Sequence, residues 1–262
     1  MEAIQFLIYP FLGCVILILI HAYFGIHILE RGVIFLDLSL AQFIAVGIAV
    51  ACFLGDDPST RSFLAGAFAV LGACILSFSK RIARLINIEA FIGVLYVFSF
   101  AVSILFLDKS AHGTEEFKSI LNGNILWITR EDLLKGSLLY AAIGGLHVLF
   151  WKKFIDLSYG NGKGFFWEFL FFLSFAFVLV SSVQIAGILQ VFSFLVIPAL
   201  IGRIYTRDPV RILLIGWAIG LAVSLLGVSL SYKLDVPTAP LIVAGLSLIF
   251  FILLALKAIS RA

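Results

Sequence analysis

Long apolar runs separated by short polar segments dominate the sequence. A transmembrane helix needs about 20 predominantly apolar residues, and we place nine such runs along the chain. The pattern therefore predicts an all-α polytopic membrane protein with about nine transmembrane helices. The runs cover residues 4–23, 33–54, 62–79, 90–107, 133–151, 165–182, 185–202, 212–230 and 238–256.

Two regions depart from this regular alternation. Only a tight turn near Ser181–Gln184 separates the sixth and seventh runs, so one of that pair could be short or re-entrant. Residues 114–129 are too polar to cross a bilayer and predict a short helix on a surface.

Composition agrees with a membrane protein. Hydrophobic residues make up 63% of the chain, charged residues 13%, and the mean hydropathy is +1.17. A typical soluble domain is about 45–50% apolar and about 25% charged. The three cysteines lie in apolar runs without a C-x-x-C pair, so they indicate neither a disulfide framework nor a thiolate metal site. The N-terminus lacks a basic segment and a cleavage motif, so we interpret it as a first span.

The distribution of Lys and Arg predicts the orientation, because cytoplasmic loops carry an excess of both. With nine spans and the N-terminus outside, 12 of the 18 fall in inside loops, which predicts an N-out, C-in protein. The inside residues are Arg31, Lys80, Arg81, Arg84, Lys152, Lys153, Lys163, Arg203, Arg207, Arg211, Lys257 and Arg261.

The stretch from Gln184 to Arg211 joins an apolar run to a basic segment. Pro198 interrupts the run, and proline bends or ends a helix because it lacks a backbone donor. Residues 198–211 are therefore expected to leave the membrane on the cytoplasmic side. A segment of this kind could couple the membrane helices to conformational changes of a soluble subunit. An ordinary basic loop is the alternative. The polar residues expected to take part are Arg203, Arg207, Asp208 and Arg211.

Four polar side chains within or at the ends of the spans are candidates for a transport path, because a charged or polar group inside a bilayer is costly unless it is satisfied and is therefore a functional candidate. They are Asp37, Gln42, Glu89 and Gln190. Capping of a helix N-terminus is an equal alternative for the two acids, and hydrogen bonding between helices is one for the two amides. His147 lies near a span end and is expected either to reach towards the interface or to be packed, rather than to be a metal ligand.

Two kinds of catalytic site find no support in the sequence. No G-x-x-x-x-G-K-[ST] motif is present, so ATP would have to be bound by a partner. No Ser/His/Asp arrangement of a hydrolase is visible either. The chain is therefore not expected to be an enzyme.

Four short motifs, in order, carry a resemblance to a known family. They are Glu89-Ala-Phe-Ile-Gly93, Leu121-Asn-Gly-Asn-Ile-Leu126, Gly187-Ile-Leu-Gln-Val with Ile197-Pro-Ala199, and Leu234-Asp-Val-Pro-Thr-Ala-Pro240. Together they resemble the permease subunit of bacterial ABC importers for zinc, manganese or iron, the ABC-3 family. The resemblance covers about residues 33 to 250.

The sequence departs from the family pattern at two places. The family has an Asp-x-x-x-His pair of metal ligands in its second helix, whereas Gln42 stands at the histidine position and Leu38 at the aspartate position. Asp37 and Gln42 are five residues apart, about 140° around a helix, so they cannot repeat that geometry. The family's cytoplasmic F-D-P segment is shortened here to residues 154–160.

The resemblance implies one transmembrane permease domain over residues 1–262 that works by alternating access in a bacterial plasma membrane. It implies a homodimer of the permease, an ABC ATPase subunit and a metal-binding solute-binding protein as partners, besides the lipid bilayer, and no nucleic acid. No tightly bound cofactor is expected, and the metal is cargo.

Two other classes stay open. One is a carrier or exporter driven by an ion gradient, which would need more intramembrane charge than Asp37 and Glu89 provide. The other is an intramembrane enzyme, for which no constellation of His, Asp, Glu, Ser or Lys at mid-membrane depth is visible.

Overall fold

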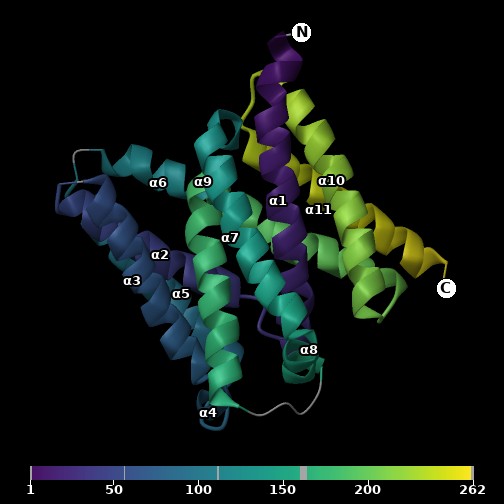
Figure 1. The fold of residues 1–262 in the computed structure, drawn as a ribbon, viewed down its shortest axis with the longest axis horizontal. Helices are drawn as coiled ribbons and strands as arrows, with labels where there is room; N and C mark the ends of the chain where they lie inside the picture. Colours follow the sequence, from purple (N-terminus) through teal and green to yellow (C-terminus); the bar gives the residue numbers. More distant parts are fainter. Residues whose placement is uncertain (1, 56, 111, 160–163, 261–262) are drawn as a thin grey trace. The chain divides into compact units, whose positions relative to one another are not determined.

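The computed structural model describes every residue except 1, 56, 111, 160–163, 261 and 262, and every element in the described part is helical. Figure 1 shows the helices. They are α1 Glu2–Arg31, α2 Leu36–Phe53, α3 Pro58–Ser77, α4 Ser79–Ile82, α5 Ile88–Leu107, α6 Gly113–Asn122, η1 Ile125–Trp127, α7 Arg130–Leu149, α8 Trp151–Tyr159, α9 Phe165–Tyr205, α10 Pro209–Leu234 and α11 Thr238–Ile259.

The all-α membrane fold predicted from the sequence is confirmed. In the described residues seven helices are long and apolar enough to cross a membrane, and α7 with α8, bent by 77°, makes an eighth candidate. This count is one lower than the predicted nine because α9 contains both the sixth and the seventh predicted runs. The predicted short polar helix is present as α6 and η1.

The break in α9 lies elsewhere than the sequence predicts. The element is 41 residues long, and Gly187 interrupts it with φ 74° and ψ 163°, a backbone conformation that essentially only glycine adopts. The predicted turn near Ser181–Gln184 is therefore wrong by about three residues. The helix also continues through Pro198 to Tyr205, so it does not end at the proline. Proline is tolerated in transmembrane helices because neighbouring elements compensate for the lost hydrogen bond.

The contacts within the chain cluster in two compact units, each built from separate segments. Unit 1 comprises residues 1–29, 122–142 and 185–262, and unit 2 comprises residues 30–121 and 143–184. The break at Gly187 lies three residues beyond the passage from unit 2 to unit 1, so most of each part of α9 belongs to a different unit.

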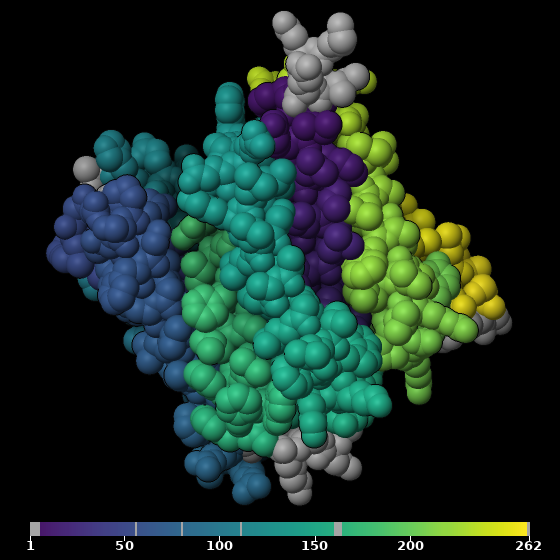
Figure 2. All heavy atoms as spheres, in the orientation of Figure 1, coloured from purple at the N-terminus to yellow at the C-terminus, as the bar shows by residue number. Residues whose placement is uncertain are grey.

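In unit 1, α1 and α10 pack closely, and Figure 2 shows them side by side. The Trp217 indole N–H donates to the Leu19 carbonyl over 3.1 Å. Gly220 permits the approach, since a Cβ there would lie 2.4 Å from the Ile18 side chain. The second part of α9 meets α10 in the same way, because a Cβ on Gly202 would lie 2.6 Å from the Ile212 carbonyl oxygen. Small residues at such crossings are typical of membrane helices.

In unit 2, α2 packs against both α3 and α5. A Cβ on Gly47 would lie 2.5 Å from the Leu64 carbonyl oxygen of α3, so the two backbones are almost in contact. α2 and α5 run parallel. The Ile34 N–H bonds the Glu89 carboxylate at one end, and the rings of Phe53 and Phe106 meet at the other. We call the end with the Ile34–Glu89 bond the α4 end of unit 2, and the end with the Phe53–Phe106 contact the α6 end.

Candidate functional site

The two candidate path residues on α2 are both buried. The exposed fraction is 1% for Asp37 and 3% for Gln42. Since α2 is covered on nearly all sides, burial does not distinguish one face of this helix as a path. No donor among the described residues hydrogen-bonds Oδ1 of Asp37. A buried carboxylate oxygen is costly unless water, an ion or a proton satisfies it.

Glu89 has a structural contact that the sequence did not reveal. The residue that caps α5 is Asn87, whose side chain accepts the Ala90 N–H over 3.0 Å. The carboxylate of Glu89 instead accepts the backbone N–H of Ile34, just before α2, over 3.2 Å. This bond ties the start of α5 to the turn before α2, so Asp37 and Glu89 lie at the same end of unit 2.

Gln190 lies in the second part of α9, in unit 1. Its amide N–H donates to the Cys14 sulfur of α1 over 3.5 Å, a weak bond between two buried side chains. No described donor reaches its Oε1. The expectation that Gln190 faces a path together with Gln42 concerns two different units and stays a prediction.

The segment 198–211 forms a helix end, a short turn and a helix start. Asp208 is the N-cap of α10 and accepts the Val210 N–H over 2.8 Å. Arg211 lies 3.7 Å from the Asp208 carboxylate, one turn along. Arg203, Arg207 and Arg211 are all exposed, so this turn presents a basic surface.

Sequence reasoning missed one close contact in unit 1. Gly123 has φ 61°, and a Cβ there would lie 2.1 Å from the Ala186 carbonyl carbon and 2.2 Å from the Gly187 nitrogen. The turn after α6 therefore lies directly against the break in α9. Gly123 and Gly187 both belong to the motifs that resemble the family, and this membership was the only sign in the sequence that they matter. The sequence does not show that two motifs so far apart are in contact. Broken helices with compact backbone packing are characteristic of transporter sites.

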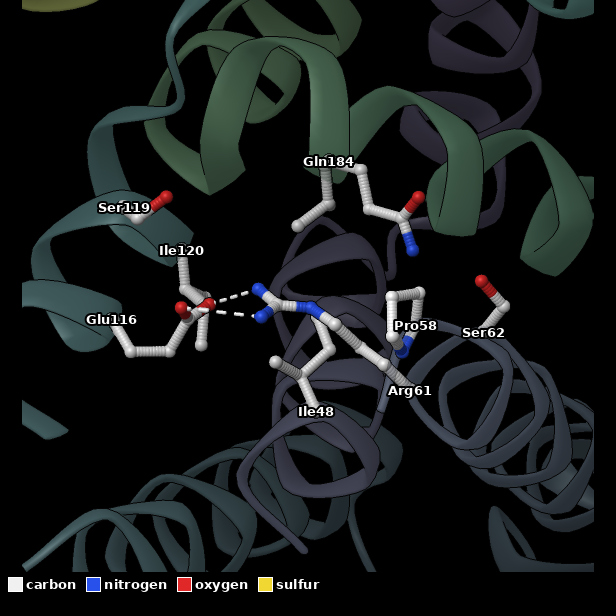
Figure 3. A pocket seen from close by; sticks show the side chains of 9 residues that line it. Ile48, Pro58, Arg61, Ser62, Glu116, Ser119, Ile120 and Gln184 are labelled. Carbon is white, nitrogen blue, oxygen red and sulfur yellow. Dashed lines mark hydrogen bonds and ion pairs between the residues drawn. The ribbon is translucent and has the colours of Figure 1, made fainter. Parts of the chain in front are cut away.

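A polar pocket lies at the α6 end of unit 2. It has a volume of about 230 Å³ and is lined by Ile48, Pro58, Arg61, Ser62, Glu116, Ser119, Ile120, Val183 and Gln184. Figure 3 shows Arg61 of α3 reaching across it to Glu116 of α6. The guanidinium bonds both carboxylate oxygens of Glu116, one of them over 3.3 Å.

A second polar cluster lies at the α4 end, beside a pocket of about 270 Å³. Arg31 pairs with Glu168 over 2.7 Å and donates to the Ser158 hydroxyl over 3.0 Å. Its guanidinium lies 4.1 Å from the centre of the Phe171 ring. A planar guanidinium can donate several hydrogen bonds in its plane and stack on an aromatic ring at the same time. Through these contacts Arg31 joins the end of α1 to α8 and to the start of α9.

His147 is packed, which is one of the two arrangements expected from the sequence. Its ring stacks on Phe154 with centroids 4.0 Å apart, and Nε2 lies 2.8 Å from the Ser174 hydroxyl oxygen. Within the described part of the chain, no group of three or more His, Cys, Asp or Glu side chains is placed to hold a metal ion.

Comparison with known proteins identifies the family. Residues 3–257 match the ABC 3 transport family. The chain belongs to this family. It is 25% identical to a probable iron transport system membrane protein of Haemophilus influenzae, over 96% of this chain and 93% of that protein. It is 28% identical to the chelated iron transport system membrane protein YfeC of Yersinia pestis, over 87% and 79% of the two chains.

Other matches extend the likeness to manganese transport and to solved structures. The manganese transport system membrane protein MntC of Listeria monocytogenes is 25% identical over 87% of this chain and 82% of that protein. The fold is similar to PsaBC from Streptococcus pneumoniae in complex with Fab, with a TM-score of 0.78 and 23% identity over 95% and 90% of the chains. An inward-facing metal-chelate type ABC transporter has a TM-score of 0.74 and 16% identity over 94% and 85%.

These matches confirm the family predicted from the four motifs. The chain is a multi-pass plasma-membrane protein of a family of ABC transporter permeases, a class of membrane subunit rather than an enzyme. Its homologues are membrane subunits of transport systems for metals, including manganese and chelated iron.

We expect Gly123→Ala to destabilise the protein. The new Cβ would collide with the backbone at residues 186 and 187, and the positive φ adds strain of about 1–3 kcal/mol. The melting temperature of the purified protein in detergent should fall by several degrees. Gly144→Ala on α7 is the matched control, because nothing lies within 4 Å of its Cβ position. Equal melting temperatures for the two variants would contradict the contact.

Proposed function

We propose that this chain is the permease subunit of an ATP-driven importer of a divalent transition metal: zinc, manganese or iron. The observation that carries the proposal is the family match over residues 3–257, together with metal-transport relatives that align over most of both chains. No Walker motif is present in the sequence, so ATP hydrolysis is assigned to a separate ATPase subunit.

The proposed assembly contains two permease copies, an ATPase subunit and a solute-binding protein that delivers the metal. ATP binding and hydrolysis in the partner drive alternating access. The cargo is a metal ion, and no resident cofactor is assigned to the chain.

Reconstitution tests this function. The permease is co-purified with an ABC ATPase of the same organism, placed in liposomes, and uptake of radioactive Mn²⁺, Zn²⁺ and Fe²⁺ is followed. We expect uptake of at least one of these ions that needs ATP on the ATPase side. A matched ATPase variant without its P-loop lysine should abolish it. Uptake by the permease alone, driven by a proton gradient, would contradict the proposal and favour a carrier.

For the path, we propose Gln42 as the central polar group, with Gln190 facing the same path and with Asp37 and Glu89 near the cytoplasmic mouth. Support comes from Asp37 and Glu89 lying at one end of unit 2, and from Asp37 Oδ1, which no described donor reaches. The burial of Gln42 is compatible with this role but does not single it out, because most of α2 is buried. A neutral amide holds a borderline metal less tightly than imidazole and carboxylate do. The proposed path therefore binds its metal weakly.

The double variant Leu38→Asp with Gln42→His tests the path. It places a carboxylate and an imidazole one helical turn apart, so we expect it to bind Zn²⁺ or Mn²⁺ more tightly than the wild type in calorimetry of the purified permease. Leu38→Asp alone is the control and should gain less. A well-folded double variant whose metal affinity does not rise would remove Gln42 from the path and leave it as a link between helices.

For coupling, we propose the segment from Pro198 to Arg211, whose exposed surface is formed by Arg203, Arg207, Asp208 and Arg211, while Pro198 is buried in α9. Its support is the exposed basic turn between α9 and α10, which Asp208 holds in place as an N-cap. Such a turn offers both charge and a rigid connection to two long helices.

Paired charge reversals test the coupling surface. Arg203→Glu with Arg207→Glu should lower the yield of co-purified ATPase and the ATP-dependent uptake, while the permease stays inserted and monodisperse. The matched control is Lys152→Glu with Lys153→Glu, which changes the same charge on exposed residues of α8. If only the α8 variant loses the ATPase, the coupling surface lies on α8 instead.

A further inference from the structure

The described residues that line the pocket at the α6 end of unit 2 provide one carboxylate, that of Glu116. An arginine side chain, that of Arg61, occupies the place beside it that a metal cation could take. Arg61 crosses the pocket from the first turn of α3 and binds the carboxylate of Glu116 with both terminal nitrogens. Figure 3 shows Gln184 and Ser62 on the other side of the Arg61 side chain. The space between these groups is therefore occupied by a guanidinium.

The oxygen atoms around this guanidinium suit a hard cation. The lining includes the Glu116 carboxylate, the Gln184 side-chain amide and the hydroxyls of Ser62 and Ser119. Carboxylate, amide and hydroxyl oxygens, completed by water, are the ligands that Mn²⁺, Mg²⁺ and Ca²⁺ prefer. A volume of about 230 Å³ accommodates such an ion with part of its hydration shell.

The ion pair is only partly buried. The exposed side-chain fraction is 28% for Arg61 and 17% for Glu116, so both groups keep contact with solvent. Separating charges that are partly solvated costs less than separating a fully buried pair, although a two-point Arg–carboxylate contact is stronger than an ordinary surface pair. The Arg31–Glu168 pair at the α4 end differs, since its side chains are only 10% and 5% exposed.

The pocket also lies on the side at which cargo would arrive. The distribution of Lys and Arg predicts that the loops before α3 and after α5 face outside. The pocket residue Gln184 lies three residues before the break in α9.

We propose that this pocket is an outer binding site for a hydrated divalent cation, with Arg61 as its resident counter-ion. An arriving cation takes over the Glu116 carboxylate, and Arg61 swings towards solvent. With one carboxylate the site is weak, because the affinity for a hard cation falls with the number of charged ligands. The role in transport rests on the proposed function, whereas the binding itself does not.

Titration of the purified full-length permease with Mn²⁺ tests the site, with free Mn²⁺ measured by electron paramagnetic resonance. Arg61→Gln should gain one Mn²⁺ site that Arg61→Gln with Glu116→Gln lacks. The wild type should bind about tenfold more weakly than Arg61→Gln, because apparent affinity falls with the fraction of open pocket. Lys135→Gln is the matched control, since it removes the cation from the exposed Lys135–Glu131 pair, and it should gain no site.

Arg61→Lys keeps the positive charge and provides a second test in case Arg61→Gln does not fold. An ammonium holds the carboxylate as a single point charge rather than as a fork, so its Mn²⁺ affinity should lie between those of the wild type and Arg61→Gln. Affinities of Arg61→Lys and Arg61→Gln equal to that of the wild type would overturn the proposal and make the pair a purely structural link between α3 and α6. Because transport is not measured, that failure would leave the importer assignment intact.

Discussion

A helix inside hydrocarbon must satisfy its own backbone hydrogen bonds, and the structure depends on where this chain departs from that constraint. The main departure is Gly187, which interrupts a 41-residue apolar helix. Its neighbour in unit 1 is the turn at Gly123, which also has a positive φ and approaches so closely that no side chain fits between them. The two glycines depend on each other, because the backbones at residues 123 and 187 pack so closely that a side chain on Gly123 would collide with the break.

The hydrocarbon also constrains the charged groups, because a charge inside it is costly. In unit 2 they gather at the two ends of an apolar bundle, as the Arg31–Glu168 and Arg61–Glu116 pairs. The first pair is buried, rests on an aromatic ring and joins three helices, so it is expected to be rigid. The second is partly exposed and lies in a pocket lined by further oxygen atoms, so it is expected to exchange partners. The buried polar groups of α2 that we propose for the path are Asp37, at the α4 end, and Gln42, five residues further along the helix.

The helices and the family could be predicted from the sequence because both depend on local patterns. Apolar length gave the spans, and four short motifs gave the family, which the match over residues 3–257 confirms. The break was misplaced because the polar side chains within residues 181–184 gave the local signal for a turn, whereas the break lies at Gly187, where the turn at Gly123 packs against the backbone. The partners of Glu89, Arg61 and Gly123 could not be predicted, since each lies far away in sequence and no periodicity encodes such contacts.

Cysteine labelling tests most directly whether α9 is two crossings joined at Gly187. Single cysteines replace Lys153, Arg207 and Lys118 in a variant without Cys14, Cys52 and Cys74, and intact cells are treated with a membrane-impermeant maleimide. The 41 residues of α9 amount to about 62 Å of helix at 1.5 Å per residue, summed over its two parts, which is about twice the hydrocarbon thickness. The account predicts that positions 153 and 207 are protected and that position 118 is labelled. Labelling of position 207 with protection of 153 would mean that α9 crosses once, and would contradict it.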